Sequence, residues 1–182
     1  SGTHHNLDLP FLVLATQSPI EQEGTYPLPE AQLDRFMFSI NLQYPSFQEE
    51  VNVVKNTTSS SSSDVNQVLS SDDILQIQKL IRKVPVADNV IEYAVRLVGK
   101  TKPKTLEATS FINQYVDWGA GPRASQDLIL ASKANAAIHG KYSPDIEDVK
   151  KVAIPILSHR IVKNYKAEAE NITITDIITS LF

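Results

Sequence analysis

Arg123 is the residue whose position most directly suggests chemistry on a phosphate group. It follows Gly121 and Pro122, a pair that predicts the first turn of a helix. A cation is unfavourable at this end of the helix dipole, so helix stability does not account for the residue. A phosphate would account for it, because it could bind the guanidinium and the backbone amides of the first turn together. A salt bridge to an acid such as Asp117 or Asp127 is an equally good explanation.

Ser18 and Arg35 could also face a phosphate, although the local sequence explains each of them without a ligand. Ser18 follows an apolar run at residues 11–15, and its hydroxyl can donate and accept a hydrogen bond. It is more simply the polar end of a strand before Pro19. Arg35 ends a short helix predicted over residues 29–34, where a cation stabilises the helix dipole by about 0.3–1 kcal/mol.

Two apolar segments are predicted to be the strands that position these side chains. Residues 11–15, FLVLA, form a continuous apolar run that is typical of a strand covered on both faces in a parallel sheet. Residues 36–42, FMFSINL, are the second candidate. A strand of this kind needs neighbouring strands on both sides, so the chain is expected to be part of a larger fold.

A serine-rich linker separates these strands from a helical region. The run from Asn56 to Ser63 has nothing to bury and predicts a mobile linker, with a domain boundary between Tyr44 and Asp64. The connection at 102–121 is expected to hold a short extended piece at 111–113, and the tail a strand-like piece and a final helical turn. Apolar residues at helical spacing predict a small bundle of four helices, over residues 71–84, 88–99, 121–140 and 145–155.

The composition is that of one ordinary globular domain, or of a small domain with a piece of another. The chain has 182 residues, 42% of them hydrophobic and 21% charged, with a net charge of −4. No apolar run approaches the roughly 20 residues that a membrane span requires, and no signal peptide is predicted. The absence of cysteine excludes disulfides and thiol chemistry and fits an intracellular protein. The four histidines have no metal-ligand spacing, so we predict no metal site built from protein side chains alone.

Three sequence blocks resemble the MoxR-type AAA+ ATPases. They are ATQSPIEQEGTYPLPEAQLDRF at residues 15–36, YP at 44–45, and GAGPRA at 119–124 before an alanine-rich helix. The resemblance covers nearly the whole chain, and the first block is highly specific. It implies a mainly α fold in two parts. Residues 1–45 would be a small α/β remnant of a P-loop ATPase core with two strands, and residues 46–182 a linker and an α-helical lid of about four helices.

The resemblance also implies roles for the three candidate residues. Ser18 occupies the sensor 1 position, where the family usually has an asparagine that helps to place the attacking water beside the γ-phosphate. Arg35 would be an arginine finger that reaches the nucleotide of a neighbouring subunit, and such a finger can raise turnover by about 10³–10⁵. Arg123 would be the sensor 2 residue, which contacts nucleotide.

Two other features are open to more than one interpretation. His159 and Arg160 match an HR pair of the family, yet at a helix end they are more simply a surface pair that complements the helix dipole. Trp118 is expected to pack the start of the lid into the core, with stacking on a base as the less favoured alternative.

The function implied by the resemblance is ATP hydrolysis with Mg²⁺ in a homo-oligomeric ring, expected to be hexameric and cytoplasmic. Such rings remodel or mature protein partners, among them proteins with von Willebrand factor A domains. These residues hold neither a G-x-x-x-x-G-K-[ST] loop nor a strand ending in paired acids, so the chain alone is expected to be inactive. The alternatives are a noncatalytic helical interaction module and a helicase-like lid associated with nucleic acid. Net charge and the lack of a long basic face argue against the latter.

Overall fold

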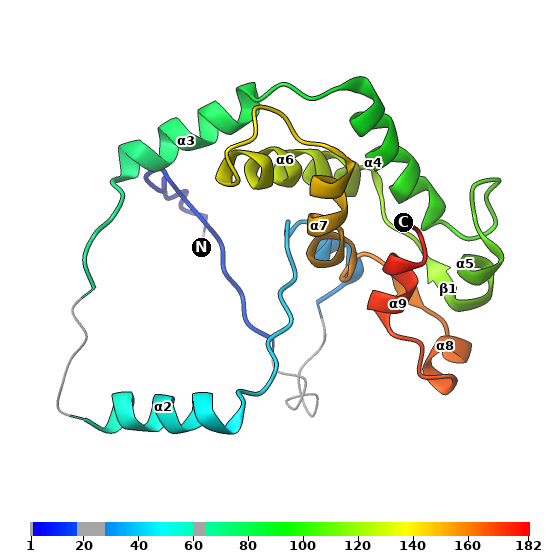
Figure 1. Ribbon diagram of the computed structural model, residues 1–182, viewed down its shortest axis with the longest axis horizontal. Helices are drawn as coiled ribbons and strands as arrows, with labels where there is room; N and C mark the ends of the chain where they lie inside the picture. Colours follow the sequence, from blue (N-terminus) through cyan, green and yellow to red (C-terminus); the bar gives the residue numbers. More distant parts are fainter. Residues whose placement is uncertain (1, 18–27, 60–64) are drawn as a thin grey trace.

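A group of packed helices makes up most of the structure (Figure 1). The computed structural model describes residues 2–17, 28–59 and 65–182. Within these ranges the mainly helical class predicted from the sequence is confirmed. The helices are α1 (Glu30–Leu33), α2 (Phe47–Thr58), α3 (Ser71–Lys83), α4 (Asp88–Lys100), α5 (Ser110–Tyr115), α6 (Pro122–Ile138), α7 (Ile146–Leu157), α8 (Tyr165–Ala169) and α9 (Ile174–Thr179).

The four helices of the predicted bundle are confirmed as α3, α4, α6 and α7. Local sequence explains where several of them begin. The hydroxyl of Ser70 accepts from the amide of Asp73 while the Asp73 carboxylate accepts from the amide of Ser70, which is a capping box at the start of α3. Asp145 and Asp148 form the same arrangement at the start of α7. Pro155 lies inside α7, which ends two residues later.

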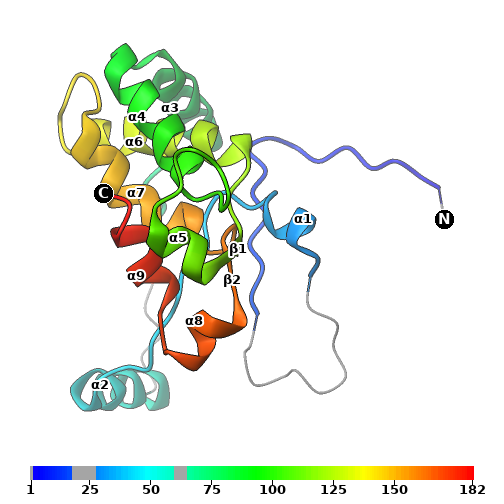
Figure 2. The same cartoon turned by 90° about the vertical axis from the view of Figure 1, so that its right-hand side faces the viewer.

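The two predicted strands at residues 11–15 and 36–42 are not strands in this structure. Both segments lack strand pairing, and their apolar side chains are largely exposed, with Leu12 78% and Leu42 88% accessible. Figure 2 shows the first residues of the N-terminal segment extending away from the helices. The physical reason is that a buried strand needs neighbours for its amides, carbonyls and side chains, and the described residues supply none here.

The sheet that does form is elsewhere and has two strands. β1 (Val116–Trp118) pairs antiparallel with β2 (Val162–Lys163), with Val116 opposite Lys163 and Trp118 opposite Val162. The prediction that Trp118 packs into the core is wrong, since its side chain is 68% exposed. Ala120, two residues further on, takes the buried position at the start of α6. The two-residue partner strand is too short to cover the indole.

Three helices, α2, α5 and α8, were missed because their sequences carry weak periodicity. α2 overlaps the predicted linker only at residues 56–58, and its start is fixed by a capping box between Ser46 and Glu49. It stands apart from the other helices (Figure 1). Residues 111–113, predicted to be extended, belong to α5, where the hydroxyl of Thr109 accepts from the amide of Ile112. In the tail, α9 matches the predicted final helical turns, but no strand precedes it.

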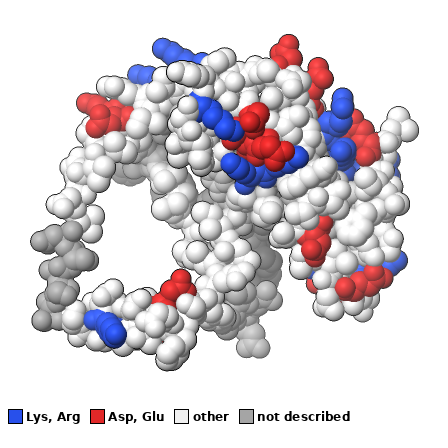
Figure 3. Space-filling view, in the orientation of Figure 1, with Lys and Arg blue, Asp and Glu red and all other residues white. Residues whose placement is uncertain are grey.

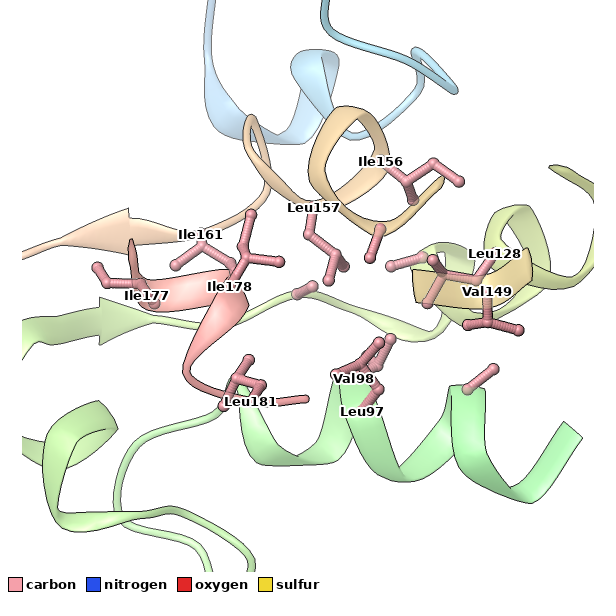
Figure 4. Close-up of a cluster of buried hydrophobic side chains, with 14 of the residues drawn as sticks. Leu97, Val98, Leu128, Val149, Ile156, Leu157, Ile161, Ile177, Ile178 and Leu181 are labelled. Atoms are coloured by element: carbon pink, nitrogen blue, oxygen red, sulfur yellow. The ribbon is translucent and has the colours of Figure 1, made fainter. Parts of the chain in front are cut away.

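The hydrophobic core joins α4, α6, α7 and α9 (Figure 4). Fully buried side chains meet at its centre, among them Leu97, Leu128, Ile156, Leu157 and Ile178. Burying each of these side chains stabilises the fold by about 1.5–3 kcal/mol relative to leaving it in water. This packing fixes the start of α6 and the end of α7 relative to each other, and the candidate site lies where these ends meet the segment that follows α1.

Candidate functional site

The segment that follows α1 is attached to α6 and α7 by four charged side chains. They are Asp34, Arg123, Asp127 and Arg160, and we call them the Asp34 cluster. Asp34 follows α1, while Arg123 and Asp127 lie in the first two turns of α6. Arg160 lies just beyond the end of α7. The cluster contains two positive and two negative groups, so its charges balance.

Arg160 is the buried centre of this cluster. Its side chain is 1% exposed, and its Nε donates to Asp34 Oδ1 at 3.0 Å. One terminal nitrogen, Nη2, donates to Asp127 Oδ2 at 2.6 Å and to the backbone carbonyls of Asp34 at 3.0 Å and Phe36 at 2.9 Å. The other, Nη1, donates to the Ile156 carbonyl at 3.1 Å. A charge so far removed from water is tolerated because two carboxylates and three carbonyls surround it.

His159 reinforces the same attachment. Its Nε2 lies 2.9 Å from the Phe36 carbonyl, and because that oxygen only accepts, Nε2 carries the proton. Burial lowers the pKa of the imidazole, opposed by the Phe36 hydrogen bond and reinforced by the positive charge of Arg160. Nδ1 is buried with no partner among the described residues. The interpretation of His159 and Arg160 as a surface pair is therefore wrong, because the segment after α1 covers this helix end.

Arg123 forms a salt bridge in the first turn of α6. Its Nη1 lies 2.7 Å from Asp34 Oδ2 and 3.4 Å from the Asp34 carbonyl, and its side chain is 49% exposed. The salt-bridge explanation of Arg123 therefore describes its contact in this structure, but the partner is Asp34 rather than Asp117 or Asp127. An ion pair this exposed contributes only about 0–1 kcal/mol. Gly121 caps α6 without a side-chain hydrogen bond, so among the described residues no side chain caps the first-turn amides.

Arg35 is the one member of the Asp34–Phe36 segment whose side chain is exposed and makes no hydrogen bond or ion pair with any described residue. Its backbone amide donates to the Gln32 carbonyl at 3.2 Å. Both of its neighbours are held by Arg160, so the backbone is fixed while the guanidinium is free.

The structure brings Arg123 next to the segment that carries Arg35, because Arg123 pairs with the adjacent Asp34. It does not describe Ser18. That residue lies outside the described ranges. No group of three or more His, Cys, Asp or Glu within residues 2–17, 28–59 and 65–182 could hold a metal ion. Among the same residues, no helix has the length and apolar character needed to cross a bilayer.

Charge on the visible face is mixed rather than basic. In the view of Figure 3, acidic and basic side chains are interspersed over the described residues. A duplex-binding surface would instead gather lysine and arginine along one face. This face therefore offers no support for the helicase-like alternative.

Two family models match the chain, and the residues of the Asp34 cluster are divided between them. The ATPase family associated with various cellular activities (AAA) matches residues 1–38, and the AAA lid domain matches residues 109–181. The first match contains Arg35, and the second contains Arg123 and Arg160.

Curated proteins and a solved structure are similar over most of the chain. Chaperone MoxR1 of Mycobacterium tuberculosis (strain ATCC 25618 / H37Rv) is 39% identical over 164 residues, which are 90% of this chain and 43% of that protein. The uncharacterized protein YeaC of Bacillus subtilis (strain 168) is 35% identical over 180 residues, 97% of this chain and 53% of that protein. The crystal structure of "a putative ATPase from Cytophaga hutchinsonii ATCC 33406" has a TM-score of 0.89 at 40% identity, covering 97% of this chain and 54% of that one. The chain belongs to the MoxR-type AAA+ ATPases. It spans about half the length of the curated relatives that it matches.

In this MoxR-type chain the sequence-based interpretation missed the contact between two charged residues, Asp34 and Arg160. The available signals were the acid directly before Arg35 and the family HR pair. No spacing rule links residues that lie 126 positions apart, as Asp34 and Arg160 do. Only the docking of the segment after α1 onto the ends of α6 and α7 brings them into contact.

Proposed function

We propose that the protein carrying this chain hydrolyses ATP with Mg²⁺ in a ring of identical subunits, expected to be hexameric and cytoplasmic, and remodels or matures protein partners. Membership of the MoxR-type AAA+ ATPases supports the ATPase activity. The printed name of the Mycobacterium relative, a chaperone, supports a chaperone-like role. Proteins with von Willebrand factor A domains are the partners that we would test first. The division into a core part at residues 1–45 and a lid part at 46–182 is part of the proposal.

The observation that carries this proposal is the free guanidinium of Arg35 on a fixed backbone. A surface arginine that served only its own fold would be expected to lie along a neighbouring acid or along apolar surface. Arg35 forms no hydrogen bond or ion pair with any described residue, although Asp34 is adjacent in sequence and binds two other arginines. A cation held outward in this way suits a phosphate on a neighbouring subunit, where it would neutralise charge that develops during phosphoryl transfer. A contact of this head-to-tail kind gives a ring when the rotation between successive subunits closes.

Arg123 is proposed to bind a phosphate of the nucleotide, as the sensor 2 residue. The site fits an anion, because the α6 amides have no side-chain cap and the guanidinium is half exposed. Its bond to Asp34 is weak enough for phosphate to replace it, since a charge-assisted Arg–phosphate pair is stronger than an exposed ion pair. MgATP supplies the γ-phosphoryl group that passes to water. Ser18 is proposed to orient that water with its hydroxyl at the sensor 1 position.

The test is ATP turnover by the full-length protein with single substitutions. Arg35→Ala is expected to lower kcat by about 10³-fold or more with little change in nucleotide affinity, because its contact would form in the transition state. Arg123→Ala is expected to weaken nucleotide binding as well. Arg96→Ala, an exposed arginine of α4, is the matched control and should change neither quantity. If neither substitution changes turnover by more than about threefold, the assignment of both arginines is wrong.

A further inference from the structure

We propose that Arg160 is a positioning residue that aims Arg35 at the neighbouring subunit. This inference rests on the proposed function of Arg35 and adds the element that orients it. The decisive geometry is that one nitrogen, Arg160 Nη2, donates to the carbonyls on both sides of Arg35. These oxygens belong to Asp34 and Phe36, at 3.0 and 2.9 Å.

The Asp34 carbonyl belongs to the peptide plane before Arg35, and the plane after Arg35 is held through the Phe36 amide, which donates to the Leu33 carbonyl at 3.0 Å. The Phe36 carbonyl belongs to the next peptide, so its bond to Arg160 anchors the chain just beyond Arg35. Fixing these planes sets the direction in which the Cα–Cβ bond of Arg35 leaves the backbone. His159 donates to the Phe36 carbonyl as well, and further on the Ser39 amide donates to the Pro155 carbonyl at 2.8 Å. The segment from Asp34 to Ser39 therefore follows the end of α7, and α1 by itself does not set its path.

The shape and charge of the Arg160 side chain suit this task. Its guanidinium is planar and presents its donors in a rigid fork, and each nitrogen of that fork is used. Asp127 and Asp34 balance its charge and keep the fork in one orientation. A lysine would keep the charge, but its single ammonium could not reach Asp34 Oδ1, Ile156 and the two flanking carbonyls together.

Arg123 is a useful contrast because it contacts Asp34 without reaching the far side of Arg35. It is half exposed and bonds only to Asp34, whereas Arg160 is buried and bridges Asp34 and Phe36. Loss of Arg123 from Asp34 would leave the second carboxylate oxygen and both flanking carbonyls bonded to Arg160 as before. The two arginines therefore have different tasks, with Arg160 setting the position of Arg35 whether or not Arg123 binds Asp34.

The experiment uses full-length protein in rings mixed from two kinds of subunit. Donor subunits carry a disabled phosphate loop and an intact Arg35. Acceptor subunits carry Arg35→Ala and an intact phosphate loop, so turnover requires a donor arginine beside an acceptor nucleotide. Arg160→Lys is then introduced into the donor alone or into the acceptor alone. In the donor it misdirects a working Arg35, and in the acceptor it affects a segment whose arginine is already absent.

We expect the donor substitution to lower turnover of the mixed ring by about 10–100-fold, since misplacing a catalytic group by about 1 Å can cost about 10²-fold. The loss of turnover caused by the acceptor substitution should be at least fivefold smaller than the loss caused by the donor substitution. Equal losses in the two arrangements, or a greater loss in the acceptor, would show a general effect on the lid and overturn the proposal. A mixture of unsubstituted donor and acceptor that hydrolyses no ATP would instead refute the action of Arg35 between subunits, and this inference with it.

Two further variants keep the comparison decisive. Arg96→Lys makes the same chemical change on an exposed face of α4 and should leave turnover unchanged in both arrangements. If Arg160→Lys subunits do not fold or assemble, His159→Ala replaces them, because it removes the second donor to the Phe36 carbonyl and keeps Arg160. A loss that is larger in the donor than in the acceptor by about threefold or more supports the proposal, and an equal loss overturns it.

Discussion

Replacing Asp148 by Asn should destabilise the fold strongly at neutral pH and only weakly in acid. Asp148 lies in the first turn of α7, with its side chain fully buried, and its carboxylate accepts hydrogen bonds from three groups. The Asn135 amide is 2.8 Å away, the Lys141 ammonium 2.9 Å and the Asp145 backbone amide 3.0 Å. An asparagine would turn an NH₂ group toward one of these donors, so at least one hydrogen bond would be lost.

The size of the effect follows from the carboxyl pKa. Burial opposes ionisation of Asp148, but the hydrogen bonds from Asp145, Lys141 and Asn135 outweigh it and lower the pKa from 3.8 to about 2. At about 1.4 kcal/mol per pH unit, this corresponds to about 2 kcal/mol of stability. Since the folded pKa is the lower one, this contribution is fully present above the ordinary pKa. It is lost as the pH falls from about 5 to about 2.

The assay is the free energy of unfolding in urea, measured for the chain and for Asp148→Asn from pH 7 to pH 2. The difference between the two proteins should be at least about 2 kcal/mol at pH 7 and should shrink steadily below pH 5. Glu147→Gln is the matched control, because Glu147 is the adjacent acid, pairs with Lys150 at 2.7 Å and is 67% exposed. It should cost no more than about 0.5 kcal/mol. A pH-independent difference for Asp148→Asn, or one no larger than that of the control, would refute the reasoning.

Three further predictions concern the Asp34 cluster and the core. Arg160→Met should destabilise the fold by about 3–5 kcal/mol because it leaves two acids near a buried gap, whereas Arg123→Ala should cost about 1 kcal/mol or less. The free energy of unfolding, measured by chemical denaturation, distinguishes the two variants. Similar losses of stability would contradict the contrast drawn between the two arginines. Leu128→Ala, at a fully buried site, should cost about 2–5 kcal/mol and lower Tm. Because the pKa of His159 is lowered on folding, its neutral form is favoured. The fold should therefore lose stability relative to His159→Gln as the pH falls below about 6.5, and parallel pH profiles would contradict this.

The helical part of the fold was largely predictable from the sequence. α3, α4, α6 and α7 each combine apolar residues at helical spacing with a local start signal, such as the Ser70 capping box or Pro122 at the first helical position. These signals act within one or two turns, so neighbouring residues alone determine them. α5 was predicted wrongly because six residues carry too little periodicity to separate a helix from an extended piece.

The strands were predicted wrongly for the opposite reason. An apolar run such as FLVLA at residues 11–15 predicts burial, but burial is supplied by other segments. None of the described residues pairs with this run, so it stays extended and exposed. The roles proposed for Ser18, Arg35 and Arg123 remain predictions, since the structure supports some of them and tests none.

The sequence by itself determined the family, the positions of the main helices and the arginines that could act on phosphate, because motifs and periodicity are local properties. The tertiary structure decided which side chains meet. Asp34, Arg123 and Arg160 are far apart in the chain, and their contacts exist only because the core packs the start of α6 against the end of α7. That packing buries Arg160, leaves Arg35 exposed and links the two through the carbonyls between them. No local pattern encodes such an arrangement, since it depends on where separate helices end in space.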